Sequence, residues 1–286
     1  MTYPNRTKAG ALAVIVSLST LQLGNALAMA LINSLGPGLA TSLRVGFGAL
    51  IMLPVLLLLR RSPKVPRRHV VVYGVVLALM QLSFYQAISH LTLSMAVSIE
   101  FLVPLMAGCV LTRSRAARLP VVGAIAGLAL IADYSAHMPI EGMLWALATG
   151  ILLTIYIQVG TAAPAGTNPL RMLAQALWVA FPIVLVGQFM GPAPDLMAVG
   201  PMAGQAVIVA ILTLLVPFSL ELFAMMRLRP LPFAMMSSMD PVFASAVGVF
   251  GLSQYLELRQ VLGLLILTVC GAWCIRAEHR ASHAEA

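Results

Sequence analysis

Residues 203–225 read AGQAVIVAILTLLVPFSLELFAM, a stretch in which Glu221 is the one charged residue. At about 1.5 Å of rise per residue, a helix of this length is longer than the roughly 30 Å hydrocarbon core of a bilayer. The stretch does not alternate between polar and apolar positions, as a membrane-spanning β-strand would. It therefore predicts a helix that crosses a membrane.

The whole chain contains ten such apolar runs, separated by turn-forming segments such as 33–37 and 191–195. We therefore predict an all-α integral membrane protein with ten transmembrane helices, of which the fifth is the shortest. The predicted spans are residues 9–31, 37–59, 70–89, 93–112, 118–133, 141–162, 169–190, 203–225, 231–252 and 258–275.

The first run also allows a second interpretation. Arg6 and Lys8 precede it, and Ala26-Leu27-Ala28 resembles the small-residue site at which a secretory signal is cleaved. The run is long for a signal peptide, so the favoured interpretation is a first transmembrane helix.

The composition excludes other classes of protein. Of the 286 residues, 60% are hydrophobic and 9% are charged, against roughly 45–50% and 25% in soluble domains. A soluble globule cannot bury so much apolar surface, and a disordered chain would not contain it. The three cysteines all lie inside apolar runs and suggest neither a disulfide framework nor a metal site.

The basic residues are distributed asymmetrically. If the N-terminus is cytoplasmic, every one of the 17 Lys and Arg residues except Arg44 and Arg259 lies in or beside a cytoplasmic segment. This distribution follows the positive-inside rule and predicts that both termini are cytoplasmic. Nucleic-acid binding would instead need a shared basic face with aromatic residues, so the lipid bilayer is the expected partner and nucleic acid is not.

Ten spans divide into two sets of five, and an odd number of spans inverts the second set relative to the first. The segments Ala87–Pro104 and Ala224–Pro241 have the same length, with a leucine at the same position in each. We expect two inverted five-helix repeats, residues 1–136 and 137–286, around a central cavity.

Four ionisable residues lie inside predicted spans, namely Arg44, Glu100, Glu221 and Asp240. Each costs about 2.5–3.5 kcal/mol at a helix centre, so their presence indicates a wet cavity or a pathway between helices. Arg44 and Glu100 share a depth of about 10 Å. They form either an ion pair that fixes helix register or a substrate site. Asp240 lies near the midplane, with no basic residue at its depth.

Three further polar residues have two interpretations each. Glu221 is nearer the cytoplasmic end of its span, within reach of Arg227 or Arg229, and is either part of an interfacial charge cluster or a functional carboxylate. Gln81 and Tyr85 in the third span either form interhelical hydrogen bonds or bind substrate.

Two prolines lie close to the buried acids. Pro104 leaves the carbonyl of Glu100 without its helical donor, and Pro241 does the same to Ser237. Irregular backbone is tolerated at membrane depth where it lines a cavity. We therefore predict two helix breaks that face one central site, with Ser237 and Ser238 as substrate-binding candidates.

Segments around these charges resemble the threonine/homoserine exporters of the drug/metabolite transporter superfamily, whose repeat is the EamA domain. They are Ser42–Arg44, Ala96–Leu105, Pro217–Glu221 and Ser238–Pro241. The resemblance extends over nearly the full length. It implies two inverted halves in the cytoplasmic (inner) membrane and export of small amino acids driven by the proton gradient.

The resemblance also implies functional roles for Glu100, Glu221 and Asp240. The family usually has glutamate where this chain has Asp240, which shortens the reach of the carboxylate. It usually has Gly-Glu where this chain has Leu252-Ser253-Gln254.

Together these features predict a proton-coupled exporter of small zwitterionic amino acids that works by alternating access. Arg44 would receive the substrate carboxylate and Glu100 the ammonium group. Asp240, Glu221 and Glu100 are candidates for proton coupling, because desolvation favours a neutral carboxyl group. The expected partners are a small-molecule substrate and protons, and the chain is expected to be a monomer or a homodimer.

Three alternatives remain at this point. The chain is an exporter of another metabolite or drug (an aromatic compound or a nucleobase), a passive channel, or a membrane-embedded enzyme. The enzyme is disfavoured because the sequence has no HExxH, no GxSxG and no clustered His or Cys ligands. We therefore expect no catalytic residue, no metal and no cofactor.

Overall fold

The computed structural model describes residues 3–63, 65–91, 93–111, 115–132, 139–187, 189, 199–243, 245 and 257–284. These residues form helices joined by short connections, and there is no β-strand among them. The helices are α1 (Tyr3–Leu58), η1 (Leu59–Arg61), α2 (Arg67–His90), α3 (Leu93–Leu111), α4 (Arg115–Ile131), α5 (Ile140–Thr161), α6 (Pro169–Gly187), α7 (Val199–Ala210), η4 (Ile211–Leu215), α8 (Val216–Met225), α9 (Pro230–Ser237) and α11 (Leu258–Ala284).

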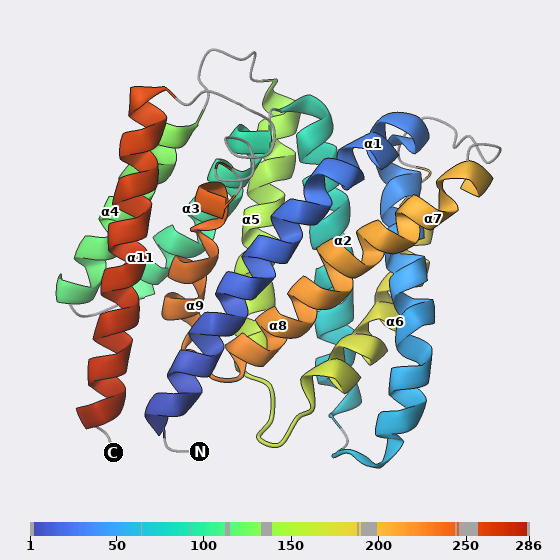
Figure 1. Cartoon of the computed structure of the whole chain (residues 1–286), viewed down its shortest axis with the longest axis horizontal. Helices are drawn as coiled ribbons and strands as arrows, with labels where there is room; N and C mark the ends of the chain where they lie inside the picture. Colours follow the sequence, from blue (N-terminus) through green and yellow to red (C-terminus); the bar gives the residue numbers. More distant parts are fainter. Residues whose placement is uncertain are drawn as a thin grey trace.

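The first two predicted spans are the two arms of α1, which turns sharply at Gly36 (Figure 1). Gly36 has φ 76° and ψ 161°, a conformation that glycine adopts without steric cost. Pro37 follows and suits the first turn of the second arm, where a missing backbone N–H removes no helical hydrogen bond. The sequence Gly36-Pro37 thus determines where the first arm ends and the second begins.

The stretch 203–225 belongs to one apolar helical segment that runs from α7 through η4 into α8. The η4 segment, Ile211–Leu215, is a π-helical turn. Pro217 follows it and has no N–H to donate to the carbonyl of Thr213, four residues earlier, so the α-helical pattern is interrupted at this point. Wide turns of this kind frequently mark functional sites in helices.

Within the part of the chain that the structure describes, five helical segments are long and apolar enough to cross a membrane. They are Ala30–Arg61, Arg67–His90, Ile140–Thr161, Pro169–Gly187 and Val199–Met225, and shorter apolar helices cover Met95–Gly108, Arg118–Ile131 and Leu258–Trp273. Large apolar side chains are exposed on the outer faces, such as Leu57 on α1 and Val269 on α11. A surface of this kind is suited to lipid rather than to water.

Every predicted span overlaps a helix. The ninth, 231–252, begins as α9 and continues as helix over 240–243, while residues 244 and 246–256 lie outside the described part of the chain. The fifth and shortest predicted span, 118–133, corresponds to α4.

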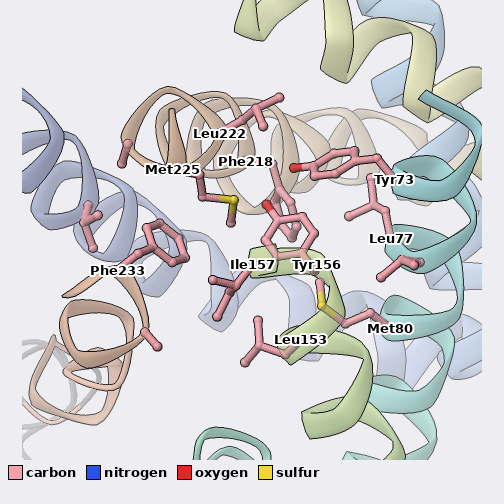
Figure 2. Packing of buried hydrophobic residues seen from close by; sticks show 14 of the residues in the cluster. Tyr73, Leu77, Met80, Leu153, Tyr156, Ile157, Phe218, Leu222, Met225 and Phe233 are labelled. Atoms are coloured by element: carbon pink, nitrogen blue, oxygen red, sulfur yellow. The ribbon is translucent and has the colours of Figure 1, made fainter. Parts of the chain in front are cut away.

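The main core draws on most of the helices, and Figure 2 shows the part of it where α2, α5, α8 and α9 meet. The rings of Tyr73 and Tyr156 lie 5.1 Å apart between centroids, and the Tyr156 ring lies edge-on to Phe218 at 5.8 Å. All three side chains are buried. Aromatic pairs at such separations add to the packing energy of the buried area.

Helices α4 and α11 cross closely at two glycines. A Cβ atom added at Gly263 would lie 2.6 Å from the carbonyl oxygen of Gly127, and one at Gly127 would lie 3.0 Å from that of Gly263. Gly123 of the same Gly123-x-x-x-Gly127 motif packs against the sulfur of Cys270. The small-residue face of α4 is therefore used for packing within the bundle.

The α1–α2 connection, the α5–α6 connection and both chain ends lie at one end of the bundle, the lower end in Figure 1. Across this end, the Arg171 guanidinium donates a hydrogen bond to the carbonyl of Ser62, which ties α6 to the α1–α2 connection.

Candidate functional site

Arg44 is buried in the bundle, with 4% of its surface exposed. Its Nη1 donates to the hydroxyl of Thr213 on η4 at 3.3 Å, and its guanidinium lies over the ring of Tyr85 on α2, 4.7 Å from the centroid. Nε and Nη2 are buried and have no hydrogen-bond partner among the described residues. Arg44 is thus a positive charge deep in the bundle with two donors available.

A second available donor group lies nearby on α2. Gln81 precedes Tyr85 by one helical turn, so the two side chains share a face of the helix. Gln81 is 5% exposed, and its Nε2 has no partner among the described residues. Arg44 and Gln81 therefore offer unpartnered N–H groups, of which those of Arg44 carry a positive charge, and these donors are suited to an anion.

No ion pair joins Arg44 to Glu100, although such a pair was one of the two interpretations of their shared depth. The guanidinium is turned to Thr213 and Tyr85, and Glu100 is half-buried with no hydrogen bond or ion pair to any described residue. Equal depth in the membrane was the basis of that expectation, but depth does not determine which side of a helix faces which neighbour.

Asp240 receives a hydrogen bond from the first arm of α1. The amide nitrogen of Gln22 donates to its Oδ1 at 2.7 Å, and Asn25 in turn donates to the amide oxygen of Gln22 at 3.0 Å. Gln22 and Asp240 are both buried. The result is a short polar chain that connects the carboxylate to α1.

Glu221 on α8 is also connected to α1. Ser17 donates to its Oε1 at 3.1 Å, and Tyr156 of α5 donates to its Oε2 at 3.1 Å. Arg227, one of the two arginines expected within reach of Glu221, stacks on the ring of Phe223 and donates to its backbone carbonyl.

Glu100, Glu221 and Asp240 form what we call the acidic cluster, because they lie on elements that pack on one another: α9 contacts both α3 and α8. They come from α3, α8 and the segment after α9. Carboxylates in a low-dielectric interior are poorly solvated, so this cluster is suited to binding a cationic group.

The two proline segments differ. The helix ends at Ser237, turns at Ser238–Met239 and resumes at Asp240. The Ser237 hydroxyl is buried without a partner among the described residues, whereas Ser238 donates to the carbonyl of Met235 at 2.8 Å. This segment is therefore interrupted next to the acidic cluster.

The predicted break at Glu100–Pro104 is wrong, because α3 continues as a helix through Pro104. The carbonyl of Glu100 instead faces α5, where a Cβ atom added at Gly150 would lie 2.7 Å from the oxygen. The missing side chain of Gly150 lets α5 pack against the carbonyl that Pro104 frees.

Comparison with known proteins identifies the class of this membrane protein. The EamA-like transporter family model matches residues 140–277. Threonine/homoserine exporter RhtA of Escherichia coli (strain K12) is 32% identical over 256 residues, which are 88% of this chain and 86% of that protein. The chain belongs to the EamA-like transporter family.

A second relative agrees with this membership, and a solved structure supports the fold. Threonine/homoserine exporter RhtA of Salmonella typhimurium (strain SL1344) is 30% identical over 257 residues, which are 88% of this chain and 86% of that protein. A solved crystal structure has the same fold, with a TM-score of 0.72 and 17% sequence identity over 97% of this chain and 98% of that chain. The predicted family is thus confirmed.

Family membership establishes a multi-pass inner-membrane transporter of a small-molecule substrate, and it confirms that this EamA-like protein is not an enzyme. Among the described residues, no group of three His, Cys, Asp or Glu side chains is arranged to hold a metal ion.

In this transporter, the Arg44 site and the Glu221 carboxyl group lie at different depths along the helices. Thr213, which contacts Arg44, lies about 12 Å of helix rise from Glu221 on the same helical segment. Gly24 packs against Thr213, while Ser17 of the same arm contacts Glu221. The first arm of α1 therefore runs alongside both levels.

Sequence reasoning missed Ser17, Gln22, Tyr156 and Thr213 as partners of the charged residues. The signal for Gln22 was a long amide side chain inside a 20-residue apolar run, which is costly without a partner. Ser17 and Thr213 gave no comparable signal, because hydroxyl groups inside helices usually bond to the preceding turn.

Proposed function

We propose that this transporter exports small amino acids of the threonine and homoserine type by proton-coupled alternating access. The relatives' names supply the substrate class. The observation that carries the proposal is the buried guanidinium of Arg44, whose Nε and Nη2 have no partner among the described residues. A charge kept in this state inside a membrane protein needs a function, and binding an anionic group is the simplest one.

A zwitterionic amino acid needs both an anionic and a cationic partner to cross the hydrocarbon core of the membrane. The substrate carboxylate would bind Arg44, with Gln81 as a neighbouring donor, through charge-assisted hydrogen bonds. The ammonium group would bind Glu100, whose carboxylate has no partner among the described residues. Because Arg44 and Glu100 are not paired with each other, each remains available to one of the charged groups of a substrate.

Asp240 and Glu221 are the proposed proton-coupling groups. Each is hydrogen-bonded to the first arm of α1, through Gln22 and Ser17 respectively. Protonation removes the charge that these donors bind, so it weakens the contact between α1 and the second half of the chain. One proton moving inward supplies about 2.3 kcal/mol per 100 mV of membrane potential.

Alternating access would come from two inverted repeats, residues 1–136 and 137–286. The helix contacts support this division. The fifth and tenth spans, α4 and α11, pack on each other, as symmetry-related partners would. Likewise α2 packs on α6 at Gly74, and the second arm of α1 packs on η4 at Gly48. The first contact joins the third and seventh spans, and the second joins the eighth and second. Exchanging the two repeats converts one contact into the other.

We also infer that the termini face the cytoplasm. The end of the bundle that carries both termini and the α1–α2 and α5–α6 connections (Figure 1) includes Arg60, Arg61, Arg67, Arg68 and Arg171. Positively charged connections remain on the cytoplasmic side during insertion.

The test is efflux of labelled threonine and homoserine from vesicles that contain the purified transporter, with and without an imposed pH difference. We expect efflux of both substrates to accelerate when protons can flow in the opposite direction. Faster transport of an aromatic compound or a nucleobase, which also competes with threonine, would overturn the substrate class. Downhill flux that ignores the pH difference would indicate a passive channel.

A further inference from the structure

A groove of about 510 Å³ lies between the start of α2 and the end of α5, away from the polar interior. It is lined by the apolar side chains of Val72, Val159 and Ala162 and by Gln158, and its rim at the start of α2 carries Arg68 and His69. Val72 is 39% exposed, whereas the next residue, Tyr73, is fully buried in the core. The groove therefore opens on the outer face of the helix pair, where lipid contacts the bundle.

The level of the groove in the membrane follows from the helices that form it. Helices α2 (Arg67–His90) and α5 (Ile140–Thr161) are each long and apolar enough to span the bilayer. The groove lies at the first turns of one and the last turn of the other, which is the level of the lipid headgroups. Apolar side chains beside a positively charged rim match a lipid at this level.

The rim is positively charged and has unused hydrogen-bonding capacity. Arg68 is exposed, and no hydrogen bond or ion pair joins it to the described part of the chain. His69 is partly buried, and its Nε2 is buried without a partner among the described residues. The first turn of α2 contains no acidic residue, so no carboxylate there neutralises Arg68.

We propose that this groove binds the headgroup of an anionic phospholipid, with the phosphate at Arg68 and a headgroup hydroxyl or phosphate oxygen at His69 and Gln158. The glycerol backbone and the upper part of one acyl chain would lie along Val72, Val159 and Ala162. A zwitterionic choline headgroup is a poorer match, because its ammonium group would approach the Arg68 guanidinium. The inference requires only that the chain spans a membrane, so it is independent of the proposed substrate.

Phosphatidylglycerol is the probe for the test, with phosphatidylcholine as the neutral comparison. The purified full chain in a neutral detergent is titrated with each lipid, and native mass spectrometry measures the fraction of chains that retain it. We expect selective retention of phosphatidylglycerol. Arg68→Gln should weaken its binding about fivefold, because a basic residue near an anionic headgroup contributes about that factor.

Two matched variants make the test specific to the groove. Arg61→Gln removes the same charge at the same end of the bundle but outside the groove, and it should leave phosphatidylglycerol retention unchanged. Val72→Trp narrows the groove without changing the charge, and it should weaken retention at least as much as Arg68→Gln. Circular dichroism and a monodisperse elution profile check that each variant is folded.

Three results would overturn the proposal. Equal losses in Arg61→Gln and Arg68→Gln would mean diffuse attraction to a basic surface. Unchanged retention in Val72→Trp would place the lipid elsewhere. Displacement of phosphatidylglycerol by millimolar inorganic phosphate would mean a site for soluble anions. Each of these measurements is made without transport, so failure of the lipid site is distinguishable from failure of the proposed export activity.

Discussion

Replacing Arg44 with methionine separates substrate binding from structural support. Methionine keeps much of the length and apolar volume of the side chain but removes the charge and every donor. If Nε and Nη2 bind the substrate carboxylate, two charge-assisted hydrogen bonds are lost, each worth about 1.5–3 kcal/mol. The apparent affinity for threonine should then fall by a factor of about 100 or more.

Arg44→Met should not lower the stability of the protein, whereas a substitution that breaks a buried structural ion pair would lower it. Arg44→Met gives up the 3.3 Å bond to Thr213 and the contact with the Tyr85 ring, the latter worth roughly 0.5–2 kcal/mol. It also removes a buried charge whose cost is about 2.5–3.5 kcal/mol. The melting temperature should therefore stay the same or rise, whereas breaking a buried ion pair would cost about 3–5 kcal/mol.

The assay combines threonine efflux over a range of internal concentrations with thermal unfolding in detergent. Arg171→Met is the matched control, because Arg171 is also buried and donates to the carbonyl of Ser62 at the end that carries the termini. It should lower the melting temperature and leave the KM for threonine unchanged. An Arg44→Met protein that melts several degrees earlier with an unchanged KM would refute the assignment of Arg44 to substrate.

Three further predictions concern the acidic cluster and the packing. Asp240→Asn should abolish the response of efflux to an imposed pH difference while the protein still inserts and folds, and a retained response would remove Asp240 from coupling. Gln22→Leu removes the donor at 2.7 Å from the charged carboxylate, which makes protonation easier, so the pH of half-maximal efflux should rise; an unchanged pH profile would contradict this. Gly263→Ala places a Cβ atom 2.6 Å from the Gly127 carbonyl oxygen and should lower stability by about 1–3 kcal/mol. Thermal unfolding compares it with Gly204→Ala, whose Cβ meets nothing within 4 Å; equal melting temperatures would mean that α4 and α11 can separate without cost.

The sequence determined the helices and their breaks, because these depend on local chemistry. Apolar runs long enough for a bilayer became helices, and Gly36-Pro37 separated the first two spans as expected. The turn at Ser238–Met239 also lies in a segment whose pattern predicted irregular backbone. At Pro104 the same local argument failed, since packing of α5 at Gly150 allows α3 to remain a helix.

The sequence also identified which residues are unusual, since a charge inside an apolar run is visible without a structure. Only the tertiary structure decided their partners. The hydrogen-bond partners of Arg44, Asp240 and Glu221 are separated from them in the chain by 169, 218 and 204 positions, respectively. Helical rise fixes the depth of a side chain, but rotation about the helix axis and the choice of neighbouring helix decide what it touches, and these follow from packing of the whole bundle.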